Sequence, residues 1–308
     1  MNNVIRLLTN VFRRRLLQRF HKLMDDFCGI EEAVFESRYK NEPVINRELV
    51  NRLANYHEDL GEVRFLNKKY RLVMRGESAS AHSKTCKVFV SPNSYFGKEL
   101  CDWILLVDYV LYEKNQEELI NSSTSFIQLK KDVGNTFRID LGQLYFLTYL
   151  PHFHYKGLCN RYEALTDNCS FYHLLHNSIT QQTILSALCL TKIFNLDEQH
   201  HLALVSRDPK RTNGLHSKLL PRISSFNLSS FLLYSVLLVL GSEYLGVREF
   251  VRTIFFPRVV GTRNCQRSAI DVDPPNPESV GSIPEMSNED EILAARIEVA
   301  LKAEEKHG

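Results

Sequence analysis

Three residues in two apolar segments have the types and spacing needed to hydrolyse a phosphodiester: Asp102, Gln128 and Lys130. Asp102 directly precedes residues 103–107, which are apolar and rich in large and β-branched side chains, as is typical of a buried strand. Residues 125–131 are also predicted to form a strand. Because side chains alternate between the two faces of a strand, we expect Gln128 and Lys130 to share a face.

The two segments predict a hairpin whose strands are joined by residues 113–124. In that hairpin Asp102 approaches Gln128 and Lys130 at one end of the sheet. The carboxylate and the amide oxygen are then suited to hold a hard cation, Mg²⁺ or Mn²⁺. The ammonium group of Lys130 can stabilise both an attacking hydroxide and the negative charge that develops on phosphorus. We therefore predict a metal site at Asp102 and Gln128, with Lys130 as the third catalytic residue.

The order of these motifs resembles the PD-(D/E)xK restriction-endonuclease-like superfamily. The sequence ELCD at residues 99–102 is followed by an apolar strand, a gap, IQLK at residues 127–130 and an amphipathic segment. In that family an Asp begins the second core strand and a Glu-x-Lys lies on the third. Gln128 departs from the usual Glu and is similar to the Gln-x-Lys variant of the Mrr-like branch. The resemblance covers residues 42–155 and implies a magnesium-dependent endonuclease that acts on DNA, with a restriction or defence role.

The same resemblance implies accessory residues. Several nuclease families of this fold carry a metal-associated Glu on the helix before the sheet, which corresponds here to Glu42, with Glu31 and Glu32 as alternatives. Glu99 lies just before the catalytic Asp and is a further candidate. Members of the exonuclease-related branch use a helix-borne Gln near the cleavage site, which corresponds to Gln143.

The whole chain is predicted to have an α/β (α+β) fold, in which a restriction-endonuclease-like mixed central sheet is flanked by helices and followed by a helical C-terminal region. Residues 1–28 have apolar positions at helical spacing interleaved with arginines, and residues 76–83 are predicted to form a loop. The predicted domains are a basic amphipathic N-terminal helix at 1–41, the core at 42–155, a helical domain at 156–262, and an acidic linker with a short C-terminal helix at 263–308.

Composition and charge narrow the class of protein. The chain is 44% hydrophobic and 10% aromatic, which is ample for a packed core. Its seven cysteines are scattered without a CxxC pair, which favours reduced thiols in a cytoplasmic protein. Residues 269–308 carry ten acids against three bases, so the remaining body has a net charge of +9. A basic body is compatible with a nucleic-acid partner.

Residues 223–242 are twenty residues without a charge, which is the minimum length for a membrane span. Six serines and Asn227 interrupt the segment. We therefore interpret it as a buried core helix that begins after Asn227 and ends at Gly241, and we expect no membrane partner.

A second hypothesis belongs to a different class of protein. Asp102 is then a turn or cap residue, Gln128 a polar residue on a strand face, and Lys130 a solvated strand end. The chain would be a non-catalytic interaction protein on a nuclease-like or other mixed α/β fold. In this case the predicted C-terminal helix, residues 292–306, and the basic N-terminal helix would be docking elements for a protein partner.

Overall fold

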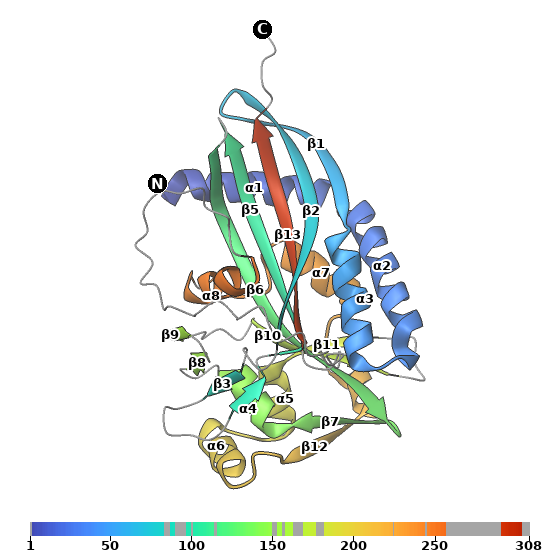
Figure 1. Ribbon diagram of the computed structural model, residues 1–308. Coiled ribbons are helices and arrows are strands. Elements are labelled where there is room, and N and C mark those ends of the chain that lie inside the picture. Colours follow the sequence, from blue (N-terminus) through green and yellow to red (C-terminus); the bar gives the residue numbers. More distant parts are fainter. Residues whose placement is uncertain are drawn as a thin grey trace, which may run out of the picture.

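The computed structural model describes residues 2–82, 87–89, 97–99, 101–113, 116–149, 153–155, 158–162, 169–176, 182–223, 225–243, 245–256 and 291–303 (Figure 1). In this part of the chain, a mixed central sheet lies between two layers of helices. The fold is therefore a mixed α/β fold, as the sequence predicts.

The helices divide between the two faces of the sheet. One core contains side chains from α1 (Asn2–Gln18), α2 (Phe20–Glu36), α3 (Glu42–Ala54) and α7 (Leu228–Val236). The other contains side chains from α4 (Leu141–Tyr149), α5 (Ala187–Ile193), α6 (Glu198–Arg207) and α8 (Leu245–Phe255). Two short 3₁₀ helices, η1 (Ser37–Tyr39) and η2 (Ser217–Arg222), complete the described helical elements.

Nine strands of the described chain belong to the central sheet. Seven follow one another in the order β1 (His57–Phe65), β2 (Lys68–His82), β13 (Glu291–Ala303), β5 (Trp103–Glu113), β6 (Gln116–Val133), β10 (Ser170–Leu175) and β11 (Gln182–Ser186). The end of β6 also pairs with β7 (Thr136–Asp140), which pairs with β12 (Thr212–His216). A separate sheet contains β4 (Gly97–Glu99), β3 (Lys87–Phe89), β8 (Phe153–Tyr155) and β9 (Leu158–Tyr162).

The β5–β6 hairpin forms the middle of the sheet. The two strands are antiparallel, and Trp103 is paired with Ile127. Every residue of β5 from Trp103 to Leu111 is buried, because helices cover both faces. The predicted hairpin is thus confirmed. The predicted connection at 113–124, however, is almost entirely strand, since β6 begins at Gln116.

The C-terminal segment corrects a prediction. The helix predicted at 292–306 is wrong over its described part, because residues 291–303 form the strand β13 between β2 and β5 (Figure 1). Residues 304–306 lie outside the described residues. Its neighbour β2 runs through residues 76–82, so the loop predicted at 76–83 is also wrong. A segment buried in the middle of a sheet cannot serve as the docking helix expected for a protein partner.

The predicted domains also differ from the observed elements. The region 156–262 was expected to be helical, but it supplies β10 and β11 to the central sheet. The core therefore extends beyond residues 42–155. The basic N-terminal helix is divided into α1 and α2 at Arg19.

The uncharged segment 223–242 contains a short buried helix. Asn227 caps α7 by accepting a hydrogen bond from the backbone N–H of Ser230, at the predicted start. The helix ends at Val236, before the predicted stop, and Leu238 has a left-handed φ of 55°. Across the described residues, no helix has the length and apolar character required to cross a membrane.

Candidate functional site

The β5–β6 register places Asp102 beside Gln128. Asp102 lies just before β5, and its backbone N–H donates to the carbonyl oxygen of Ile127 at 3.1 Å. Gln128 Nε2 donates to Asp102 Oδ2 at 2.6 Å, and the backbone N–H of Leu129 donates to the same oxygen at 2.7 Å. Two neutral donors therefore hold the carboxylate at the end of the hairpin.

Helix α4 adds a second amide to this contact. Gln143 Nε2 donates to Gln128 Oε1, so that Gln128 bridges Asp102 and Gln143. The backbone N–H of Gln143 also donates to Asp140 Oδ1 at 2.9 Å, which holds the first turn of α4. Hydrogen bonds thus run from Asp102 through Gln128 and Gln143 to Asp140.

Helix α3 brings Glu42 to the end of β6. Asn41 caps this helix by accepting from the backbone N–H of Val44, and Glu42 lies in the first turn. Glu42 Oε2 lies 3.4 Å from Lys130 Nζ, and Glu42 Oε1 accepts from the backbone N–H of Lys131 at 2.9 Å. The side chains of Lys130 and Glu42 are 20% and 33% exposed, so solvent reaches this ion pair.

The electrostatics of Asp102 connect these two groups of residues. Burial raises the pKa of Asp102 to about 6, and the negative charge of Glu42 acts in the same direction. The positive charge of Lys130 and the hydrogen bonds from Leu129 and Gln128 oppose this rise in pKa. The ionised carboxylate is therefore incompletely compensated, which is a common property of functional sites.

The donor set is compatible with a hard cation. Both hydrogen bonds that the described residues donate to the Asp102 carboxylate use Oδ2, so within this part of the chain Oδ1 is available. Magnesium is commonly held by one or two protein carboxylates, with water and substrate phosphate completing its shell. In the described residues, no three His, Cys, Asp or Glu side chains gather closely enough to hold a metal ion. A cation would thus depend on Asp102, on its neighbour Glu42 and on the amide oxygen of Gln128.

The remaining predicted residues lie elsewhere or cannot be placed. The backbone of Glu99 lies in β4, and its side chain is outside the described residues. Glu31 Oε2 accepts from the backbone N–H of Ser229 on α7, and Glu31 and Glu32 line an open groove of about 940 Å³ between α2 and α7. Glu42 is therefore the acid of the three that contacts the predicted site.

Strand β10 contributes residues that the sequence did not reveal. Tyr172 pairs with Gln128 across the parallel β6–β10 ladder, is fully buried, and has a hydroxyl without a hydrogen-bond partner in the described chain. Burial, Asp140 and Asp102 raise the pKa of Tyr172 well above its usual value, so this hydroxyl remains protonated. Farther along β6, Asp132 Oδ2 lies 3.4 Å from Nε2 of the buried His176.

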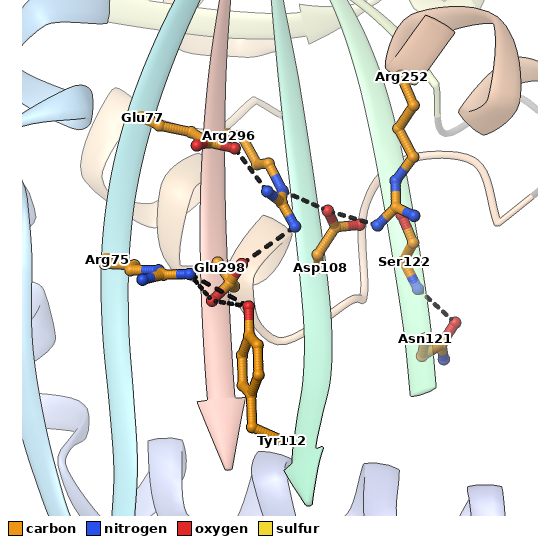
Figure 2. Close-up of polar contacts among 9 residues, drawn as sticks. All are labelled: Arg75, Glu77, Asp108, Tyr112, Asn121, Ser122, Arg252, Arg296 and Glu298. Carbon is orange, nitrogen blue, oxygen red and sulfur yellow. Dashed lines mark hydrogen bonds and ion pairs between the residues drawn. The ribbon is translucent and has the colours of Figure 1, made fainter. Parts of the chain in front are cut away.

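A second polar cluster surrounds Asp108 on β5, six residues after Asp102 in the chain (Figure 2). Asp108 Oδ2 lies 2.6 Å from Arg296 Nε and 2.7 Å from Arg252 Nη2, so β13 and α8 both bind this carboxylate. Arg296 also contacts Glu77 at 2.6 Å and Glu298 at 3.1 Å. We call these five residues the Asp108 network. It fixes the C-terminal strand against β2 and β5 through charged groups.

Comparisons with known proteins find no match to this chain. No family model, curated protein or solved structure matches it. Function must therefore be inferred from the geometry of the Asp102 site.

Proposed function

We propose that this protein is a metal-dependent nuclease with a restriction-endonuclease-like core of the Gln-x-Lys type. The observation that carries the proposal is the clustering of residues drawn from three separate elements. Asp102, Gln128 and Gln143 are joined by hydrogen bonds, and Lys130 and Glu42 form an ion pair whose charges act on Asp102. The resemblance implied these five residues, and they lie on the β5–β6 hairpin, α3 and α4.

Each residue has a distinct proposed role. Asp102 binds Mg²⁺ or Mn²⁺ through its carboxylate, and the cation supplies Lewis-acid stabilisation of the phosphate charge. Lys130 stabilises the attacking hydroxide, and Glu42 positions the Lys130 ammonium group. Gln128 orients the carboxylate, and Gln143 holds the Gln128 amide in the required direction.

The proposed substrate is DNA, cut internally in a restriction or defence role. The body of the chain is basic, which supports binding to a phosphate backbone. Most of the affinity would come from Lys and Arg contacts with phosphates, so binding should weaken steeply as salt concentration rises. Cys28 and Cys189 are free thiols in the described chain, which is consistent with the cytoplasm as the proposed location.

Cleavage of supercoiled plasmid tests the proposal. Purified protein would be incubated with plasmid and with single-stranded RNA, each in Mg²⁺, in Mn²⁺ and in EDTA. We expect the wild type to nick or linearise the plasmid only when a metal is present. Asp102→Asn and Lys130→Met are expected to reduce the rate at least about a hundredfold, because removing one group that stabilises transition-state charge commonly has such an effect.

Lys131→Met is the matched control. Lys131 follows Lys130 directly, but its Nζ is directed to the carbonyl oxygen of Lys40 at an exposed position. The two lysine variants therefore remove the same charge from adjacent positions, and of these two only Lys130→Met should reduce the cleavage rate about a hundredfold. Cutting that persists in Asp102→Asn and Lys130→Met would assign the activity to another site or to a contaminant.

One observation favours the alternative, a non-catalytic interaction protein. The amide oxygen of Gln128 already accepts a hydrogen bond from Gln143. Among the described residues, Asp102 is the only carboxylate that is hydrogen-bonded to Gln128, so few ligands are available for a cation. Calorimetric titration with Mn²⁺ discriminates the two functions without substrate. A wild-type protein that neither binds Mn²⁺ nor cleaves DNA or RNA would support the non-catalytic alternative.

A further inference from the structure

Unpartnered buried polar atoms gather beneath α8, away from the Asp102 site. In the described chain, fourteen buried side-chain nitrogen or oxygen atoms lack a hydrogen-bond partner. Five of them belong to β5, β6 and α8, and we call them the Arg248 cluster: Asp108 Oδ1, Ser122 Oγ, Thr124 Oγ1, Arg248 Nε and Arg252 Nη2. Buried polar groups in native proteins are normally satisfied, so such a concentration indicates a missing polar partner.

The strand register places the three oxygen atoms of this cluster on one face. Asp108 pairs directly with Ser122 across the β5–β6 ladder, and Thr124 is the next residue of β6 on the same face. Asp108 and Thr124 are fully buried, and Ser122 is 2% exposed. Figure 2 shows Arg252 reaching from α8 to Asp108. Its Nη2 lies 2.7 Å from Asp108 Oδ2 but is not aligned for a hydrogen bond.

The negative charge of Asp108 acts on both guanidinium groups of α8, those of Arg248 and Arg252. Arg75, Arg296 and Arg252 each form an ion pair with Glu298 or Asp108. Arg248, one turn before Arg252 on α8, adds a further guanidinium group. Burial lowers the pKa of Arg248, and neighbouring Arg252 lowers it further, whereas Asp108 and the exposed Glu249 act in the opposite direction. An added negative charge at this position would stabilise both arginines.

We propose that the Arg248 cluster binds a protonated tetrahedral oxyanion, with inorganic phosphate as the ligand. The guanidinium groups of Arg248 and Arg252 and the hydroxyls of Ser122 and Thr124 donate hydrogen bonds to its oxygens. Asp108 Oδ1 can only accept, and it accepts a hydrogen bond from the P–OH group, whose proton stays on the phosphate. This acceptor gives selectivity: sulfate carries no proton at neutral pH, so its oxygen would repel the carboxylate.

Ligand-induced stabilisation provides the test. Thermal unfolding and calorimetric titration would be measured in EDTA at pH 7.5 and constant ionic strength, with phosphate, methyl phosphate and sulfate. We expect saturable binding of phosphate and at least tenfold weaker binding of sulfate. Methyl phosphate, largely without a P–OH proton at this pH, should also bind at least tenfold more weakly, which distinguishes the free ion from a phosphoryl group on a larger molecule. Because no metal or nucleic acid is present, the result is independent of nuclease activity.

Three variants locate the binding site. Arg248→Met should weaken phosphate binding at least tenfold, and Ser122→Ala should weaken it severalfold; both leave the ion pairs of Asp108 with Arg252 and Arg296 in place. Arg14→Met removes an exposed helical arginine and should have no effect. Absence of saturable phosphate binding, or equal binding of phosphate and sulfate by all variants, would overturn the proposal. The unpartnered atoms of the cluster would then be satisfied by buried water.

Discussion

Asp102 and Asp108 lie on the same face of one chain segment, and they differ in the partners that the fold supplies. Asp108 is bound by the guanidinium groups of Arg252 and Arg296, which come from α8 and β13. Asp102 is held by the amide of Gln128 and the backbone of Leu129, and the positive charge of Lys130 acts on it without an ion pair among the described contacts. The first arrangement stabilises a buried carboxylate. The second leaves a carboxylate whose pKa is raised to about 6 and which can still gain energy from a cation.

The largest effect is expected from Asp108→Ala. Arg252 would then lose its carboxylate partner, while Arg296 would keep Glu77 and Glu298. Breaking a buried ion pair commonly destabilises a protein by about 3–5 kcal/mol. Urea denaturation measures this loss. Glu77→Gln is the control, since 48% of the Glu77 side chain is exposed and such pairs contribute about 1 kcal/mol or less. Similar losses in the two variants would contradict a central role for Asp108.

The next effect concerns the pH dependence of stability at Asp102. A carboxyl group with a raised pKa makes the folded protein bind more protons than the unfolded chain between pH about 4 and about 6. The free energy of unfolding should therefore fall as pH rises through this window, by about 1–3 kcal/mol from this group. Asp102→Asn should remove this contribution, so the variant gains stability relative to the wild type as pH rises. A stability difference that stays constant from pH 4 to 7 would be inconsistent with the raised pKa.

Gln128→Glu tests whether a cation binds beside Asp102. A second carboxylate should destabilise the metal-free protein through like-charge repulsion and strengthen Mn²⁺ binding about tenfold, equivalent to about 1.4 kcal/mol. Calorimetric titration and Mn²⁺-dependent thermal unfolding report the two effects. Gln18→Glu, at an exposed position at the end of α1, adds the same charge and should leave Mn²⁺ affinity unchanged. Unchanged affinity in Gln128→Glu would place any cation elsewhere.

Glu42→Gln is expected to give the smallest effect. The Glu42–Lys130 pair is partly exposed, so its loss should change stability by about 1 kcal/mol or less. Because the charge of Glu42 raises the pKa of Asp102, the variant should shift the Asp102 titration to lower pH, as followed by carboxyl NMR signals. Glu32→Gln, on the α2–α7 groove, is the matched control. If Asp102 titrated at the same pH in both variants, the charge of Glu42 would not act on Asp102.

The contacts around Asp102 could be anticipated because they depend on one hairpin and its two adjoining helices. The apolar run of β5, the alternation in β6 and the acid and proline at the start of α3 are all local signals. The roles of these residues in catalysis stay predictions. The position of Tyr172 beside Gln128 could not be predicted, since nothing in its local sequence shows that β10 pairs with β6.

The C-terminal strand shows why the rest of the sheet was harder to predict. Its sequence, EILAARIEVALKA, is rich in good helix formers, but its apolar positions also alternate from Leu293 to Leu301. Pairing with β2 and β5 on both sides decides in favour of the strand. The charged side chains of β13 can be buried because each forms an ion pair. Arg296 pairs with Asp108 and Glu77, and Glu298 pairs with Arg75. Such partners, distant in sequence, are not visible from the segment itself.

The position of β13 has a consequence for biosynthesis. During translation, β2 and β5 leave the ribosome long before β13, yet β13 is the strand that joins them. Until it arrives, the nascent chain has two unpaired strand edges that can associate with other polypeptides. Closing the sheet through such distant residues is a slow step, and the emerging chain should benefit from chaperones during this interval.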